Sequence, residues 1–347
     1  MSSSRQILSQ HLNVALIGYG HSGKTLHAPL IQSVNGLNLT HVVSSNEAKV
    51  NHDLPEIHVF KSAEEAFLLP EVDLVVIATP NDTHFELAKK ALKAGKHVVI
   101  DKPFTSTPAE ARELIELAKT QNKLLSVFHN RRWDSDFLTI KKLIGTKELG
   151  ELKQFESHFD RHRPEVKVRW KEQSARGGGI LNDLGSHLID QVLQLFGHPD
   201  SIQSDLEIQR DGGEGNDYFH ISMRYSKLRV ILHSTSYATS ETPRFVIHGT
   251  KGSFVKYGFD TQEDSLKEGL LPKSKGFGRD SRDGTISIIN NGIETKKVLV
   301  SEIGNYANFY NEVKNSILKQ TPNPVPPEQA FAVIEILERI NLKHNAY

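Results

Sequence analysis

The sequence contains no cysteine among its 347 residues. Disulfide bonds, thiolate nucleophiles and every metal site that needs a cysteine ligand are therefore excluded. Any chemistry has to come from Lys, His, Asp or Tyr side chains, or from a bound cofactor.

The chain also has no excess of charge of either sign. Lys plus Arg and Asp plus Glu each number 42, so the formal net charge is zero. Without a global field to attract polyanions, nucleic acid and anionic membranes are disfavoured as partners.

Long hydrophobic runs are absent as well. Residues 1–11 are polar and lack the apolar core of a signal peptide, and no later stretch approaches 18 unbroken apolar residues. We therefore expect a cytoplasmic protein with no membrane partner. The length favours two domains over one.

The first third of the chain alternates short apolar runs with helical segments. Strands are expected at residues 13–17, 37–43, 73–79, 97–100 and 123–128. Continuous apolar strands separated by helices are typical of a parallel sheet covered on both faces. The order predicts an α/β fold that begins with a doubly wound, Rossmann-type parallel sheet over residues 1–128.

Beyond Trp133 the pattern changes to consecutive strands with alternating polar and apolar residues. Strands are expected at residues 152–161, 218–225, 230–236, 244–248 and 253–257, and a hairpin turn at Asn290-Asn291-Gly292. This pattern predicts an α+β domain over residues 129–347 with a large, mainly antiparallel open sheet. Two closing helices are expected at 306–319 and 328–343, and the polar segment 263–283 is expected to be a long loop or flap.

A glycine-rich turn follows the first expected strand. Gly18, Gly20 and Gly23 fit the three glycine positions of a dinucleotide-binding turn, which lets backbone N–H groups and a helix dipole meet a pyrophosphate. The cofactor is also expected to contact the residues between them, which are Tyr19, His21 and Ser22. Pro29 is expected to interrupt the following helix after about two turns unless it kinks.

The end of the second strand bears on the choice between NAD and NADP. An NAD site usually places a carboxylate there for the ribose hydroxyls, but this chain has Ser44-Ser45-Asn46. The serine hydroxyls and Lys49 could bind a 2′-phosphate, which favours NADP while leaving NAD possible. In the alternative, the serines only cap the next turn and Glu47 binds the ribose.

Ligands of doubly wound sheets bind beyond the carboxyl ends of the strands. Thr79-Pro80-Asn81 and Asp101-Lys102-Pro103 occupy two of these positions. Lys102 could reach a substrate oxygen there, although a lone surface lysine more often only covers the domain.

A second candidate group is Asp183 with His187, at the start of an expected helix. Their spacing of four places them on one helical face, where the carboxylate could hold the imidazole and raise its basicity. Such a polar face is more often simply solvated. A metal site would need a third ligand at a defined spacing, and the sequence offers none that is convincing, so no metal is expected.

Between the two expected domains lies His129-Asn130-Arg131-Arg132-Trp133. This run of polar donors with an aromatic could line the cleft around the cofactor, which we favour for Asn130 and Trp133. Arg131 could equally belong to a salt-bridged hinge.

With these motifs assembled, the chain resembles the Gfo/Idh/MocA family of glucose-fructose oxidoreductase, inositol dehydrogenase and rhizopine catabolism proteins. The resemblance covers almost the whole chain. It rests on the glycine turn, Ala78-Thr79-Pro80-Asn81 with His84, Ala94-Gly95-Lys96-His97-Val98, Asp101-Lys102-Pro103, Asp183 and His187. The run His129 to Asp134 and the segment Arg161 to Trp170 are most similar to the branch that contains NADP-dependent scyllo-inositol dehydrogenases.

The resemblance implies a catalytic Lys, Asp and His, which map onto Lys102, Asp183 and His187. It also implies cofactor contacts from His84, Asp101, Asn130, Arg132 and Trp133, and a homodimer or homotetramer. Thr79, Pro80, Asn81 and Lys102 are expected to contact the cofactor as well. The family's usual Glu-Lys-Pro is Asp-Lys-Pro here, which leaves the lysine in place and shortens the carboxylate that supports it.

These residues suggest a hypothesis for the reaction. His187 would accept the proton of a ring hydroxyl while Asp183 orients its imidazole, and Lys102 would stabilise the developing alkoxide. The expected substrate is a ring polyol or sugar, with scyllo-inositol as one candidate. Three alternatives stay open: reduction of another sugar, aldehyde or imine; a redox-neutral glycosidase that keeps its NAD; and a non-catalytic NADP sensor.

Overall fold

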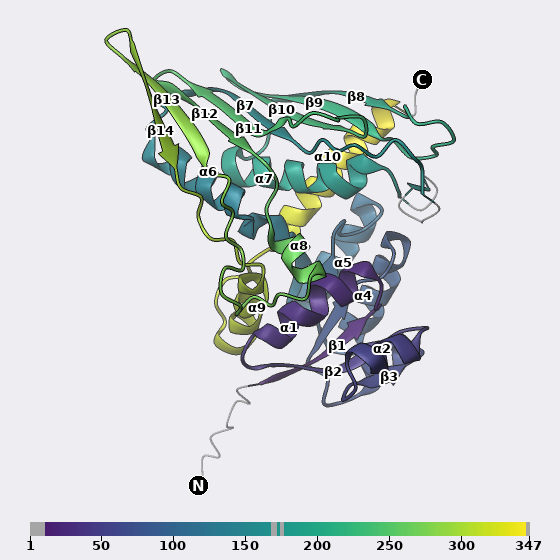
Figure 1. The fold of residues 1–347 in the computed structure, drawn as a ribbon. Coiled ribbons are helices and arrows are strands. Elements are labelled where there is room, and N and C mark those ends of the chain that lie inside the picture. Colours follow the sequence, from purple (N-terminus) through teal and green to yellow (C-terminus); the bar gives the residue numbers. More distant parts are fainter. Residues whose placement is uncertain (1–10, 168–171, 174–176, 345–347) are drawn as a thin grey trace.

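The computed structural model describes residues 11–167, 172–173 and 177–344. They form two β-sheets, each with its own helices, and the last two helices pack against elements of both halves (Figure 1). The α/β prediction is thereby confirmed. Trp170, part of the segment on which the resemblance drew, lies outside the described residues.

The first sheet has six parallel strands in the order β3-β2-β1-β4-β5-β6. The strands are β1 Leu12–Ile17, β2 Leu37–Val43, β3 His58–Phe60, β4 Leu74–Ile77, β5 His97–Asp101 and β6 Leu125–Phe128. This is the strand order of dinucleotide-binding doubly wound folds, as predicted. The sequence analysis missed β3, because three residues with only two apolar side chains give no periodic signal.

Helices connect these strands and cover the sheet. They are α1 Ala28–Ser33, α2 Glu47–Asp53, α3 Ala63–Leu68, α4 His84–Lys93 and α5 Pro108–Thr120, with a 3₁₀ turn at Asn81–Thr83 (η2). The start of α5 shows why the sequence folds locally: the Thr107 hydroxyl accepts from the Glu110 N–H, and the Glu110 carboxylate accepts from the Thr107 N–H. Pro108 begins the helix, where no N–H is needed.

The helix after the glycine turn does not stop before Pro29, and the expected interruption is wrong. A π-helical turn over Gly23–His27 (η1) precedes α1, and Pro29 falls in the first turn of α1. The wider π turn moves the hydrogen bonds one residue further back, so the missing N–H and the ring of Pro29 are accommodated.

The second sheet has eight strands in the order β14-β13-β12-β11-β7-β10-β9-β8. The strands are β7 Leu152–His158, β8 Ser201–Glu207, β9 Tyr218–Tyr225, β10 Leu228–Thr235, β11 Pro243–Gly249, β12 Gly252–Tyr257, β13 Gly284–Asn290 and β14 Ile293–Leu299. All neighbouring pairs are antiparallel except β7 with β10, which is parallel. The predicted mainly antiparallel sheet is confirmed. The hairpin turn also lies where expected, with positive φ at Asn291 and Gly292.

Helices lie on one face of this second sheet (Figure 1). The helical elements of this half are η3 Asn130–Trp133, α6 Ser135–Thr146, η6 Leu181–Gly185, α7 Ser186–Phe196, α8 Gln262–Lys267, α9 Ala307–Lys319 and α10 Pro327–His344. Phe155 of β7 marks the inner face, because its ring packs 5.3 Å from that of Phe196 in α7. The outer face carries the alternate residues of each strand and has no helix over it among the described residues.

The C-terminal segment links the two halves. Helix α9 packs against α1 and η3, and α10 packs against α5, β6 and α7. Between these helices, Asn323 donates to the carbonyl of Leu125 and Val325 accepts from the hydroxyl of Ser126, both in β6. The C-terminal segment therefore fixes the two halves relative to each other.

The segment 263–283 is largely the expected long loop, since no helix or strand follows α8 within it, but it is anchored to the rest of the molecule. It begins inside α8, which packs against η1 of the glycine turn. The Glu263 carboxylate pairs with Arg131 at 3.1 Å and with His21 at 3.8 Å, and Phe277 and Asp280 are buried further along. Charged residues suggested a free loop, but these side chains pair with partners that are distant in sequence and anchor the segment. No helix in the described part of the chain has the length and apolar character needed to cross a membrane.

Candidate active site

The glycine turn has the geometry of a dinucleotide cradle. Gly18 has a φ of +98°, and a Cβ on it would lie 2.7 Å from the carbonyl oxygen of Ala78. A Cβ on Gly23 would lie 2.1 Å from the carbonyl oxygen of Gly18, whereas a Cβ on Gly20 would meet nothing within 4 Å. Protein packing thus explains Gly18 and Gly23, and the space at Gly20 is where a pyrophosphate could approach the backbone.

Asp101, at the end of β5, connects this turn to the candidate catalytic lysine. Its carboxylate accepts from the Ser22 hydroxyl at 2.6 Å and from the Lys102 N–H at 2.8 Å, and lies 3.6 Å from Nε2 of His27. Burial by itself would raise the pKa of Asp101, but His27, Lys102 and Ser22 together hold this pKa below its ordinary value. Asp101 is therefore a charged carboxylate that binds both the glycine turn and the backbone of Lys102, which explains why a carboxylate precedes this lysine.

Lys102 and Asp183 meet across the cleft. Nζ of Lys102 lies 2.8 Å from Oδ1 of Asp183 and 2.7 Å from its backbone carbonyl. The Lys102 side chain is 12% exposed and that of Asp183 is 30% exposed. Residues 81 positions apart are thus joined at the carboxyl edge of the parallel sheet, where ligands of such folds bind.

His187 lies in α7, which follows directly after η6, the π turn that carries Asp183. Its imidazole is buried, and Nδ1 has no hydrogen-bond partner in the structure. Burial lowers the pKa of His187 well below 6.5, and the charges of Lys102, Arg131 and His129 act in the same direction. The ring is therefore neutral at pH 7, the state that can accept a proton.

The expected hydrogen bond from Asp183 to the imidazole of His187 is not seen among the described residues. The carboxylate binds Lys102 instead, and its charge only weakly offsets the lowering of the pKa of His187. The π turn Leu181–Gly185 explains the difference, because a spacing of four residues no longer stacks two side chains directly there. Asp183 consequently positions the lysine.

The loop after β4 and the first residue of α4 contribute four of the predicted residues. His84 is fully buried, and its ring nitrogens lie 3.0 Å from the carbonyl oxygen of Thr79 and 2.9 Å from that of Pro103. It thereby ties the loop after β4 to the loop that carries Lys102. Asn81 is buried with Nδ2 3.5 Å from the carbonyl of Gly177, and Pro80 precedes it as the N-cap of η2.

The end of β2 also approaches the glycine turn. Nζ of Lys49 donates to the carbonyl of Tyr19 at 3.0 Å and lies 5.5 Å from the centre of its ring. The Ser44 hydroxyl accepts from the Asn46 N–H, and Ser45 is exposed. Ser44 thus shapes the turn before α2, which Asn46 caps, and the Lys49 amine lies at Tyr19 of the glycine turn.

Two members of the run between the sheets have roles other than the predicted cofactor contact. All three guanidinium nitrogens of Arg132 bind protein: two bind Asp190, at 2.9 and 2.6 Å, and the third binds Gln329 and the carbonyl of Pro324. The indole of Trp133 packs edge-on against Phe309 of α9. These buried contacts belong to the hinge between the halves.

Two further members of this run are also buried. Arg131 pairs with Asp134 at 3.2 Å and with Glu263 at 3.1 Å, as the salt-bridged-hinge alternative required. Asn130 is 5% exposed in η3.

Arg161 is a site residue that the sequence analysis did not single out. It lines a small pocket with Asp183, and its guanidinium stacks over Phe159 at 4.6 Å and Phe259 at 5.8 Å. Burial, with Arg163 and Arg131 nearby, lowers the pKa of Arg161 to about 10. Among the described residues its guanidinium has no carboxylate partner. Two signals could have marked this residue: its position at the end of an expected strand, and its place at the start of the segment on which the resemblance drew.

Comparisons with known proteins agree with this geometry. Residues 12–129 match the family model described as "Oxidoreductase family, NAD-binding Rossmann fold", and residues 141–346 match "Oxidoreductase family, C-terminal alpha/beta domain". The chain is 48% identical over 331 residues to the uncharacterized oxidoreductase YdgJ of Escherichia coli, which covers 95% of this chain and 96% of that protein.

Two further relatives are informative. The scyllo-inositol 2-dehydrogenase (NADP(+)) IolW of Bacillus subtilis is 38% identical over 329 residues, covering 94% of this chain and 92% of IolW. A solved structure of a protein from Yersinia pestis superposes with a TM-score of 0.93 at 49% identity, covering 96% of this chain and 94% of that chain. The chain therefore belongs to the Gfo/Idh/MocA family and is an NAD(P)-dependent dehydrogenase.

Proposed function

We propose that this dehydrogenase oxidises a CH–OH group of a ring polyol or sugar with NADP, and catalyses the reverse reaction as well. The carrying observation is that the Lys102–Asp183 pair and the neutral His187 lie together at the carboxyl edge of the parallel sheet. A lysine for a developing alkoxide and an imidazole for the departing proton are the groups that this reaction needs.

The residues present fit a bound dinucleotide. The open space at Gly20 and the N-terminal end of the helix that follows suit a pyrophosphate. Thr79, Pro80 and Asn81 follow β4, and Lys102 follows β5, where the nicotinamide end would lie. When bound, the nicotinamide supplies the hydride acceptor.

In the proposed reaction, His187 takes the hydroxyl proton as the adjacent carbon loses its hydride. Lys102 donates a hydrogen bond to the same oxygen while negative charge develops on it. Asp183 holds the ammonium group of Lys102 in place by ion pairing. Burial of the imidazole excludes bulk water from the proton transfer.

The substrate class follows from the pocket wall and the relatives. Arg161, Ser234 and Asp183 line one small pocket, and such polar side chains can bind several hydroxyls of one ring. The similarity to IolW supports an inositol, with scyllo-inositol as the first candidate. The guanidinium of Arg161 would donate two hydrogen bonds to neighbouring ring oxygens.

NADP is proposed over NAD because the end of β2 carries no acidic side chain at Ser44-Ser45-Asn46 and has an amine in Lys49. Glu47 opens α2 one residue later and is exposed. A Lys49→Met variant should weaken NADP binding and leave NAD binding nearly unchanged. A matched loss for both cofactors would contradict the NADP proposal.

A homo-oligomer is proposed from the surface. The hairpin β13–β14 and the segment after it expose five large apolar side chains: Ile289, Ile293, Val298, Val300 and Ile303. The hairpin lies at one end of the second sheet and projects from the molecule (Figure 1). A second copy covering these side chains would remove them from water. Light scattering at micromolar protein tests this, and a monomer would contradict it.

The experiment for the function is turnover measured at the absorbance band of the reduced nicotinamide. Purified protein is offered NADP or NAD with a panel of inositols, aldoses and small aldehydes. Reduction of NADP by one inositol or sugar, lost in His187→Ala and in Lys102→Ala, is expected. NADP binding without turnover of any member of the panel would contradict the proposed function and favour a sensor.

A further inference from the structure

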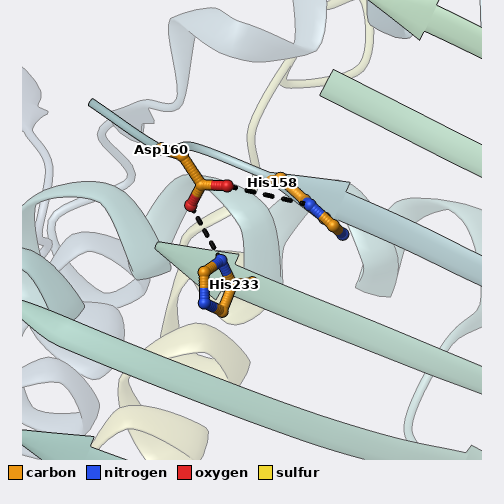
Figure 2. Close-up of side chains that lie close together, drawn as sticks. All are labelled: His158, Asp160 and His233. Carbon is orange, nitrogen blue, oxygen red and sulfur yellow. Dashed lines mark hydrogen bonds and ion pairs between the residues drawn. The ribbon is translucent and has the colours of Figure 1, made fainter. Parts of the chain in front are cut away.

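Two histidines and an aspartate come together on the outer face of the second sheet. His158 ends β7, Asp160 follows two residues later, and His233 lies near the end of β10 (Figure 2). The parallel pairing of β7 with β10 places His233 directly opposite His158. His233 is therefore a neighbour of Asp160, from which it is separated by 73 positions in sequence, and no local spacing could have indicated a metal site here.

The three side chains point at one another. Nδ1 of His233 lies 2.8 Å from Oδ1 of Asp160, and Nδ1 of His158 lies 3.8 Å from Oδ2 (Figure 2). One ligand atom from each residue can be chosen so that all three lie within 4.8 Å of one another. The histidine side chains are 18% and 21% exposed, so a small ion can reach them from solvent.

A second carboxylate supports one histidine from behind. Oε2 of Glu156 lies 2.9 Å from Nε2 of His158, which leaves Nδ1 directed toward Asp160. A carboxylate on the far nitrogen of an imidazole is the usual support of a metal-bound histidine, because it fixes the ring and raises its basicity. The Thr235 N–H holds Oδ1 of Asp160 at 3.2 Å in the same way.

We propose that His158, Asp160 and His233 bind a divalent transition-metal ion of the zinc type, with water as the remaining ligand. Two imidazoles and one carboxylate are ligands that Zn²⁺ and Co²⁺ accept, whereas Ca²⁺ and Mg²⁺ require oxygen ligands. Ligand atoms around a tetrahedral zinc lie about 3.3 Å apart, given bonds of about 2.0 Å. Shifts of about 1 Å in the side chains would bring this group to that spacing.

The proposed metal site would affect the wall of the pocket that contains Arg161 from the opposite face of the second sheet. Side chains alternate between the two faces of a strand. Phe159, Arg161 and Ser234 are next in sequence to the three ligands, so they lie on the opposite side, where they line the pocket with Asp183. An ion that ties the end of β7 to the end of β10 would hold Arg161 in its position. This role rests on the proposed function, and the ion takes no part in the hydride transfer.

The binding experiment needs no substrate. Full-length protein treated with EDTA and dialysed is titrated with zinc sulfate by calorimetry, and with cobalt(II) by visible absorption. We expect one equivalent per chain at micromolar affinity or tighter, and a cobalt spectrum of a four- or five-coordinate site.

Matched variants identify the ligands. His158→Gln and His233→Gln should each weaken zinc binding by about 100-fold or more, since loss of a supporting residue alone costs about 10- to 100-fold. His248→Gln is the control, because His248 is an exposed histidine of β11 in the same sheet and binds only Ser253 in the structure. No saturable binding to the wild type, or equal losses in the control and the ligand variants, would overturn the proposal.

The two proposals can fail separately. Zinc removal should raise the KM for the polyol several-fold and leave the Kd for NADP unchanged. Saturable zinc binding in a protein that turns over no substrate would refute the proposed function alone. Turnover in a protein without the zinc site would refute this inference alone.

Discussion

Nζ of Lys102 and Oδ1 of Asp183 are 2.8 Å apart, and this pair joins the end of β5 to the helical segment that carries His187. The lysine belongs to the parallel sheet and the aspartate to the second half of the chain. The proposed mechanism therefore requires the two halves of the chain to keep a fixed relative position, and the C-terminal helices provide this.

Replacing Lys102 by Met should lower kcat by about 10²- to 10⁴-fold, because the developing alkoxide loses its charged donor. The Kd for NADP should change little, since the glycine turn is intact. Asp183→Asn should give a smaller loss, because the lysine stays but loses its ionic anchor. Steady-state kinetics with NADP titrations by fluorescence check both variants, and equal losses of kcat and NADP affinity in the Lys102 variant would contradict the assignment.

Gly20 and Gly23 offer a matched pair of alanine substitutions in one turn. Gly23→Ala places a Cβ 2.1 Å from a backbone oxygen and should destabilise the fold by about 1–3 kcal/mol or more. Gly20→Ala meets open space, so the protein should keep its stability and lose about 5- to 100-fold in NADP affinity. Urea denaturation and NADP titration together check the pair, and unchanged NADP affinity in Gly20→Ala would argue against a pyrophosphate at that position.

How far the sequence predicts this molecule depends on the range of each signal. The glycine turn, the buried strands such as Leu74–Ile77 and the turn at Asn291-Gly292 are local patterns, and each predicted element is present. The resemblance correctly identified the family from motifs spread over the whole chain.

The contacts that the sequence analysis did not foresee join residues distant in sequence. Arg132 binds Asp190, and Glu263 binds Arg131, and no local pattern relates these residues. The π turns at Gly23–His27 and Leu181–Gly185 changed two inferences that assumed regular helical spacing, one about Pro29 and one about Asp183. The cluster of His158 and His233 depends on the one parallel pair of the second sheet, which alternation alone does not reveal.

Arg132 and Asp190 form a buried, bidentate pair, with side chains 8% and 3% exposed. Arg132→Met should lower the free energy of unfolding by about 3–5 kcal/mol, because the carboxylate is left buried with no guanidinium. The double variant Arg132→Met with Asp190→Leu should lose less. Arg112→Met removes an exposed pair with Glu335 and should cost less than about 1 kcal/mol. A weaker NADP affinity with normal stability would instead restore the predicted cofactor contact of Arg132.

The free energy of unfolding should depend on pH because of the buried histidine His129. Burial lowers its pKa to about 4 in the folded protein, against about 6.5 in the unfolded chain. Between these pH values the unfolded state binds more protons than the folded state. The contribution of His129 to the free energy of unfolding is therefore fully present above pH 6.5 and decreases as the pH falls toward 4. The slope from this residue is at most about 1.4 kcal/mol per pH unit. Denaturant titrations at pH 7.5, 6 and 5 measure this dependence, and in His129→Gln the free energy of unfolding should change less with pH. An unchanged slope in the variant would assign the loss of stability at low pH to other groups.

The pH profile of kcat/KM should test His187 as the base. Burial, Lys102 and Arg131 hold the pKa of this imidazole well below 6.5. As the pH decreases, kcat/KM should therefore stay constant through pH 6.5 and fall only when the pH approaches this lowered pKa. Lys102→Met removes a positive neighbour, which raises the pKa of His187 and should move the acid limb to higher pH in the residual activity. His187→Gln should lose the limb altogether. A limb at or above pH 6.5 in the wild type, or one that stays in place without Lys102, would assign proton transfer to a different group.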